Sequence, residues 1–304
     1  RTIVLYRVKH TTLYKYASRV SSCYNLANVS PRNTLRQRRT SHRFHVSPGP
    51  AVTHKREDYY GNETYHFEIQ KPHKELVITA ESTVDLSEIR QDDELDLGAS
   101  YKDAVQYLFE NLNPGTIEAR EFLLDSPMVR VTKELADYAR PSFEPQRSLK
   151  SCVRQLTSRI FEDFSYDPHF SAIATPLADV LEHKRGVCQD FAHLQVGCLR
   201  AMGVPARYIS GYIETLPKPG EEKLVGADAT HAWVAYYCPE EGWLEFDPTN
   251  NTSAKTQHIV TAWGRDYYDV TPVKGVIFGG GETPILEVSV DVARLHEAAG
   301  KSSR

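Results

Sequence analysis

The sequence is poor in cysteine and methionine, has no long apolar run and carries no marked excess of either charge. Its five cysteines are odd in number and show no paired spacing, which favours free thiols in a reducing compartment over a disulfide framework. No segment approaches the roughly 18 consecutive apolar residues that suggest a transmembrane helix. The net charge of −4 gives no general attraction for nucleic acid or anionic membranes. We therefore expect a cytoplasmic protein that binds neither.

Several common catalytic and metal-binding motifs are also missing. The sequence contains no His-Glu-x-x-His, no Gly-x-Ser-x-Gly and no phosphate-binding loop. Cys188, His193 and Cys198 offer zinc-binding side chains, but on a single helix they would point in different directions. We accordingly expect no metal site and no cofactor.

The sequence does have a cysteine at the start of a helix-patterned segment. Cys188 follows a Gly-containing turn and opens an apolar run with helical spacing over residues 188–202, which Gly203 and Pro205 end. The first turn of a helix presents unpaired backbone N–H groups and a positive dipole, and both stabilise a thiolate. The same N–H groups can bind the oxyanion that forms when a carbonyl is attacked. Cys188 is therefore a candidate nucleophile.

A histidine and an aspartate lie on a predicted hairpin farther along the chain. His231 opens a β-patterned run over residues 232–238, and a turn at 239–242 leads to a second run that ends at Asp247. The hairpin brings Asp247 back beside the His231 strand, although the sequence does not give the register. In such a set the imidazole acts as the base, and the carboxylate holds its tautomer and stabilises its charged form.

Each of these three residues has an ordinary structural explanation when taken alone. A cysteine at a helix start is usually structural, a histidine on a strand is often a satisfied core or surface group, and Asp-Pro-Thr-Asn is a common turn. Only the ordered set predicts catalysis. Two further residues are candidates for the same site: Tyr166 as a hydrogen-bond donor near the oxyanion or a packed loop aromatic, and Gln189 as a lining residue.

The motifs around these residues follow one another in a fixed order. They occupy residues 163–168, 175–181, 186–194, 203–212, 231–233 and 246–250. In this combination the chain resembles the transglutaminase-like superfamily of cysteine acyl-transfer enzymes, and within it a bacterial branch of transglutaminase-like enzymes and cysteine proteases. About the first 85 residues also resemble the N-terminal domain of that branch. The resemblance implies that Cys188, His231 and Asp247 form a catalytic triad. It is to a bacterial branch, so the reducing compartment expected from the cysteines would be a bacterial cytoplasm.

Periodicity and the resemblance together predict an α+β fold. An N-terminal antiparallel β domain over residues 1–88 is expected to precede a papain/transglutaminase-like α+β cysteine-enzyme core over residues 89–304. An acidic segment at 90–94 would link them. In the core, helices are predicted at 101–112, 129–139, 149–164, 176–183 and 188–202, and strands at 206–213, 232–238, 243–247, 273–278 and 285–292. The last two strands are assigned to the core.

The expected reaction is attack by Cys188 on a peptide or amide carbonyl, giving a thioester that water or an amine resolves. For this bacterial branch we expect hydrolysis of a peptide or protein substrate. Three alternatives stay open: transfer of glutamine side chains to amines by a true transglutaminase, amide hydrolysis at a glycosylated asparagine, and a non-catalytic peptide-binding module. The sequence does not indicate an oligomeric state.

One feature of the N-terminal domain has no place in this chemistry. Five arginines lie close together among Pro, Asn and Ser, at positions 32, 36, 38, 39 and 43. The expected explanation is a solvated loop or strand face, and the alternative is contact with an acidic partner.

Overall fold

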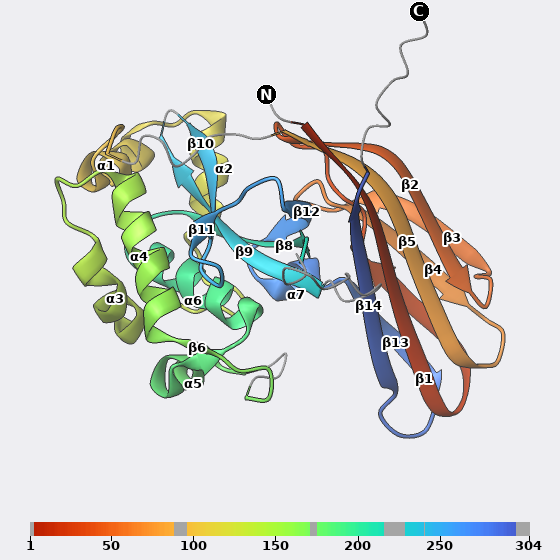
Figure 1. Ribbon diagram of the computed structural model, residues 1–304. Coiled ribbons are helices and arrows are strands. Elements are labelled where there is room, and N and C mark those ends of the chain that lie inside the picture. The colour runs from red at the N-terminus through yellow and green to blue at the C-terminus, as the bar shows by residue number, and fades with distance from the viewer. Residues whose placement is uncertain (1–2, 88–95, 171–174, 216–228, 240, 296–304) are drawn as a thin grey trace, which may run out of the picture.

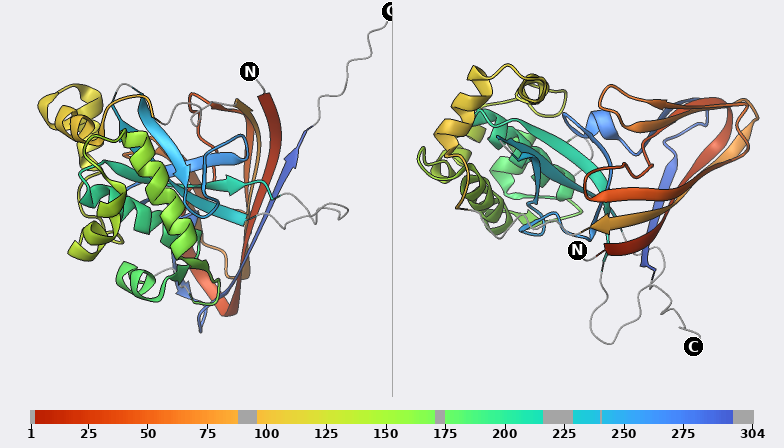
Figure 2. Two further views of the ribbon diagram at one scale, coloured as in Figure 1. Left: turned by 60° about the vertical axis from the view of Figure 1, so that its left-hand side comes forward. Right: turned by 90° about the horizontal axis from the view of Figure 1, so that it is seen from above.

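Three layers make up the protein, which we describe from a computed structural model. The description covers residues 3–87, 96–170, 175–215, 229–239 and 241–295, so the expected linker at 90–94 lies outside it. Helices form the first layer, a five-stranded sheet the second and a larger sheet the third (Figures 1 and 2). The α+β class and the N-terminal antiparallel domain predicted from the sequence are confirmed.

One long strand organises the larger sheet. The N-terminal strands are β1 (Ile3–Ala27), β2 (Gln37–Ser47), β3 (Val52–Glu57), β4 (Glu63–Ile69) and β5 (His73–Ser87), paired in the order β2-β5-β1-β4-β3. Strand β1 has 25 residues, and its early side chains alternate between buried and less buried positions as the sequence pattern predicted. Its first part pairs with β5 and its last part with β4.

The last two strands of the chain also belong to this sheet. They are β13 (Val273–Gly279) and β14 (Ile285–Arg294), and both pair antiparallel with β1. The assignment of these strands to the core domain, within residues 89–304, is therefore corrected. The pairing is physically favourable because β5 and β4 occupy one side of β1, and the other side would otherwise be an open edge. The alternating pattern of a strand does not say which sheet it joins.

Most helices precede the five-stranded sheet in the chain. Among the described residues these are α1 (Tyr101–Glu110), α2 (Pro114–Glu121), α3 (Lys133–Ala139), η1 (Arg140–Ser142), α4 (Leu149–Asp163), α5 (Leu177–His183) and α6 (Cys188–Ala201), whereas α7 (Tyr267–Val270) follows the sheet. Helix α2 was not predicted, although Asn113 caps it by accepting the Thr116 N–H at 3.0 Å and Pro114 follows at its first position. Within the described residues, none of these helices is both long and apolar enough for a membrane crossing.

The smaller sheet positions the candidate site. Its strands are β8 (Ala206–Ile213), β9 (Ala229–Cys238), β10 (Gly242–Asp247), β11 (Thr252–Ser253) and β12 (His258–Gly264), in the order β11-β10-β9-β8-β12. Helix α6 packs on this sheet, and Leu194 and Val196 are fully buried in the shared core. Short strands β6 (Ser165–Tyr166) and β7 (Arg185–Gly186) pair beside the start of α6. Strand β12 was not predicted.

The N-terminal sheet packs on the far side of the smaller sheet from the helices (Figure 1). Tyr212 of β8 and Ile259 of β12 share a buried apolar cluster with side chains of β1, β5 and β14. Two of the five clustered arginines also hold this interface: Arg36 is buried and pairs with Glu245 at 2.9 Å, and the Arg32 guanidinium lies 3.5 Å from the ring centre of Trp263. The expectation that the arginines lie on a solvated face holds for only part of the cluster, namely the exposed Arg38 and Arg43.

Candidate active site

The candidate nucleophile stands at the first residue of α6. Val187 precedes the helix, and its N–H donates to Asp190 Oδ2 at 2.8 Å, so the carboxylate folds back over the turn. A Cβ at Gly186 would lie 2.7 Å from that same oxygen, which explains the glycine. Cys188 is half-buried, whereas the other four cysteines are buried. The sequence predicted this helix with Cys188 at its N-terminus, and the expected C-terminal end at residue 202 is one residue beyond the observed end at Ala201.

The structure brings Tyr166 next to this turn. Strand β6 runs parallel to β7 with Tyr166 opposite Gly186, and the side chain remains 59% exposed. Burial of its hydroxyl and the nearby charge of Cys188 raise the pKa of Tyr166. Gln189 follows Cys188 in the first turn of α6 and is half-buried. Both residues lie where a substrate at Cys188 could meet them, and their roles stay predictions.

His231 and Asp247, expected to meet across a hairpin, form a buried pair. His231 Nε2 lies 2.8 Å from Asp247 Oδ2, and the two side chains are 7% and 0% exposed. Burial by itself lowers the pKa of His231. The charge and hydrogen bond of Asp247, together with a hydrogen bond and charge from Cys188, outweigh that effect and raise this pKa to about 10. The raised pKa favours the protonated form of the imidazole at neutral pH.

The Asp-Pro-Thr-Asn turn wraps around the Asp247 carboxylate. Oδ1 accepts the backbone N–H groups of Thr249 at 2.9 Å and Asn250 at 3.2 Å, and Oδ2 accepts the Asn250 side-chain amide at 2.7 Å. Burial raises the pKa of Asp247, but the charge and hydrogen bonds of its histidine neighbours hold it well below the ordinary value. The turn expected from the sequence thus fixes an ionised carboxylate.

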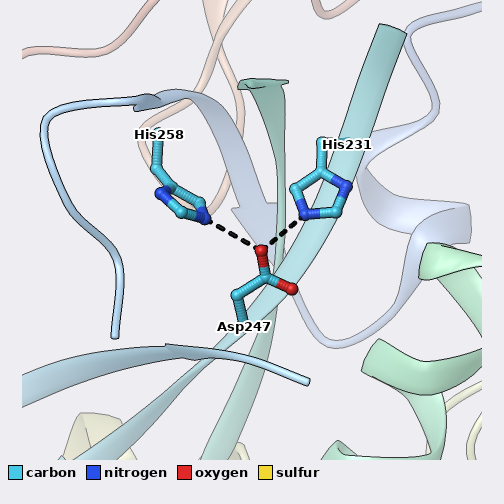
Figure 3. A group of neighbouring side chains, drawn as sticks. All are labelled: His231, Asp247 and His258. Atoms are coloured by element: carbon cyan, nitrogen blue, oxygen red, sulfur yellow. Dashed lines mark hydrogen bonds and ion pairs between the residues drawn. The ribbon is translucent and has the colours of Figure 1, made fainter. Parts of the chain in front are cut away.

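Sequence reasoning missed a second histidine at this carboxylate. His258, at the start of β12, places Nε2 2.9 Å from Asp247 Oδ2, and it approaches from the side opposite to His231 (Figure 3). It is 1% exposed. No local pattern pointed to His258, because its strand was not recognised and its partner lies across the sheet.

His231, Asp247 and His258 are also the candidate metal ligands among the described residues. Their ligand atoms all lie within 4.8 Å of one another. The same atoms form the two imidazole–carboxylate hydrogen bonds, so a cation would have to displace both. Two of the three zinc-binding side chains considered from the sequence, Cys188, His193 and Cys198, contact other groups instead. His193 Nε2 accepts the Tyr267 N–H at 3.1 Å, and Cys198 Sγ lies 3.7 Å from the Leu135 carbonyl oxygen.

Comparison with known protein families gives matches over both parts of the chain. The model for the bacterial transglutaminase-like N-terminal region matches residues 6–85, and the model for the transglutaminase-like superfamily matches residues 136–248. An uncharacterized protein of Mycobacterium tuberculosis is 40% identical over 94% of this chain and 92% of its own length. A protein-glutamine gamma-glutamyltransferase of Pseudomonas aeruginosa is 32% identical, but over only 36% of this chain and 18% of that protein.

A solved structure shares the whole fold. The crystal structure of a candidate cysteine protease from Cytophaga hutchinsonii superposes with a TM-score of 0.76 and covers 98% of this chain and 92% of that one. Its sequence identity is 21%, so the likeness establishes the fold alone. The N-terminal sheet and the core fold therefore occur together in both proteins.

Proposed function

We propose, from the premise that this chain belongs to the transglutaminase-like superfamily, that it is a cysteine acyl-transfer enzyme whose catalytic triad is Cys188, His231 and Asp247. The observation that carries the proposal is the buried His231–Asp247 pair beside a thiol at a helix N-terminus. A protonated imidazole and the first turn of a helix both stabilise a thiolate. The raised pKa of His231 favours the first, and the place of Cys188 at the start of α6 supplies the second.

In the proposed reaction Cys188 Sγ attacks the carbonyl carbon of a peptide or amide bond. His231 holds the thiol proton and delivers it to the leaving amine as the carbon–nitrogen bond breaks. The backbone N–H of Cys188 stabilises the tetrahedral oxyanion, with Tyr166 as an additional donor and Gln189 lining the site. Water, deprotonated by His231, then attacks the thioester and releases the acid and the free thiol. Asp247 keeps the imidazole oriented throughout.

We propose hydrolysis as the outcome, with a peptide or protein as the substrate, no cofactor, and no nucleic acid or membrane as a partner. All five cysteines are free thiols, and this supports the proposed location in a bacterial cytoplasm. Fractionation of the source cells would test that location, and recovery of the protein from a periplasmic extract would contradict it.

Transfer to an amine is the second candidate function. It is favoured by the likeness of one segment to the Pseudomonas protein-glutamine gamma-glutamyltransferase. The two outcomes share every step up to the thioester, and they differ only in which nucleophile reaches it.

The test is a product assay on a defined peptide mixture, with and without a labelled primary amine and a glutamine-bearing protein. Wild type is compared with Cys188→Ala and with Cys23→Ala, which removes a buried thiol in the N-terminal domain. Hydrolysed peptides with wild type and Cys23→Ala, but not with Cys188→Ala, are expected. Amine incorporation in the same pattern would establish the second candidate. Peptide binding that survives Cys188→Ala, with no product from wild type, would contradict an enzyme and favour a binding module.

A further inference from the structure

His258 is a neutral hydrogen-bond donor to the Asp247 carboxylate. Its Nδ1 accepts the backbone N–H of Lys255 at 3.2 Å, and a backbone amide can only donate, so Nδ1 carries no proton. The proton must then be on Nε2, which lies 2.9 Å from Asp247 Oδ2. Burial lowers the pKa of His258, and together with the positive charges of His231 and Arg36 it outweighs the hydrogen bond and charge of Asp247, which raise this pKa.

The two imidazoles on Asp247 therefore differ in charge. The pKa of His231 is raised and that of His258 is lowered, although both rings reach the same carboxylate oxygen. One negative charge is matched by one imidazolium, and the second ring adds a hydrogen bond without a competing charge. In such an arrangement His258 restrains the carboxylate of Asp247, and the negative charge of that carboxylate stabilises the His231 imidazolium alone.

His258 is itself fixed from the N-terminal domain. Arg36 Nη1 donates to the carbonyl oxygens of His258 at 3.0 Å and Lys255 at 3.1 Å. The Gln37 side chain donates from Nε2 to the Val260 carbonyl oxygen and accepts the Val260 N–H at Oε1, each at 2.8 Å. These are the backbone hydrogen bonds that a neighbouring strand would otherwise make. The outer edge of β12 is thus held by residues of the other domain. This gives the N-terminal domain a physical connection to the candidate site.

We propose that His258 is a positioning residue of this enzyme: it orients Asp247, and through Asp247 it orients the His231 ring. Arg36 of the N-terminal domain in turn fixes the position of His258. The inference rests on the proposed function. Without the His258 donor, Asp247 Oδ2 keeps His231 and the Asn250 amide but loses its restraint on the opposite side. A misplaced general base reacts more slowly because proton transfer requires close alignment.

The test is the second-order rate of Cys188 alkylation by chloroacetamide at neutral pH, followed by mass spectrometry. The proteins are wild type, His258→Ala, His258→Gln, His231→Ala and the His231→Ala/His258→Ala double variant. His10→Gln serves as a matched control, because His10 is buried at the domain interface and bonds to Tyr212. Thermal unfolding of each variant establishes that it is folded.

We expect His258→Ala to slow alkylation roughly tenfold. His258→Gln should recover most of the rate, since an amide N–H of similar reach can donate to Asp247. His10→Gln should have no effect. In the His231→Ala background the His258→Ala change should have no further effect, because a residue that acts through His231 has nothing left to position.

Different results would overturn different parts of the account. Equal rates for wild type and His231→Ala would overturn the proposed function, and the inference with it. A fast, His231-dependent wild type with an unchanged His258→Ala would overturn the positioning role alone. Equal slowing by His258→Ala in both backgrounds, or a folded His258→Gln as slow as His231→Ala, would show a general structural effect and also overturn that role.

Discussion

Replacing Arg36 with alanine is expected to destabilise the protein by about 3–5 kcal/mol, the usual cost of removing one partner of a buried ion pair. Arg36 Nη2 lies 2.9 Å from Glu245 Oε2, and the two side chains are only 5% and 14% exposed. The guanidinium also donates to two backbone carbonyls of the core, which would lose that donor. Glu245 would keep the Trp233 indole N–H at 2.8 Å, but it would lose its paired cation in a buried place.

A neighbouring arginine supplies the matched control. Arg38 pairs with Asp85, but its side chain is 75% exposed, so Arg38→Ala should cost only about 0–1 kcal/mol. At about 2–4 °C per kcal/mol for a protein of this size range, Arg36→Ala should lower the melting temperature by about 10 °C and Arg38→Ala by only a few degrees. Urea unfolding of both variants beside wild type gives the free energies directly.

The pH dependence has a definite sign. Burial raises the pKa of Glu245, but the charge of Arg36 and the Trp233 hydrogen bond hold it below its ordinary value. In wild type the stabilisation that the ionised Glu245 contributes is present above the pKa of this group in the unfolded protein. It is lost as the pH falls through the lower pKa that Glu245 has in the folded protein. In Arg36→Ala the pKa of Glu245 rises from its wild-type value because the charge and hydrogen bond of Arg36 are gone, while the charge of Arg207 and the Trp233 hydrogen bond remain. The stability deficit relative to wild type should therefore shrink as the solution is made acidic.

The reasoning would be refuted by equal stability losses in Arg36→Ala and Arg38→Ala, or by a deficit of Arg36→Ala that grows in acid. A further variant distinguishes the loss of the Arg36–Glu245 ion pair from the cost of leaving the Glu245 charge buried without Arg36. Arg36→Met with Glu245→Gln replaces both charges by neutral side chains, and it should be markedly more stable than Arg36→Ala.

Three further predictions concern the site. Because the pKa of His231 is raised from 6.5 to about 10, its stabilisation is complete below 6.5 and is lost toward 10; the unfolding free energy of wild type relative to His231→Gln should shrink across that window in urea titrations, and a constant difference would contradict it. Gly186→Ala would place a Cβ 2.7 Å from a carboxylate oxygen and should cost about 1–3 kcal/mol in thermal unfolding, whereas Gly49→Ala meets nothing within 4 Å and should be nearly neutral. Asp247→Asn should slow Cys188 alkylation at neutral pH roughly tenfold or more, since only a few per cent of an unassisted thiol is ionised there; an unchanged rate would show that the carboxylate does not act on the imidazole.

The parts of the structure set by local chemistry could be predicted from the sequence. The helix that Cys188 opens has a clear 3–4 residue period and a glycine stop, and it ends at Ala201, one residue before the expected end. The hairpin of β9 and β10 follows from two β-patterned runs around a turn, and it places Asp247 next to the His231 strand as expected.

The parts set by long-range pairing could not be predicted. Strand β14 joins β1 across most of the length of the chain, and its own residues give no sign of that partner. His258 of β12 meets Asp247 of β10 although two strands separate β12 from β10 in the sheet, and Gln37 and Arg36 of the other domain hold β12 in place. A buried arginine and an exposed one, two residues apart, have the same sequence environment.

The most direct test of the central claim is the pH dependence of Cys188 alkylation by chloroacetamide, from about pH 5 to pH 9, in wild type and His231→Ala. The other four cysteines are buried, so Cys188→Ala gives the background. The account predicts fast labelling of Cys188 that persists well below pH 8 and is slowed by loss of His231. Labelling that follows the titration of a free thiol, and is indifferent to His231, would contradict it.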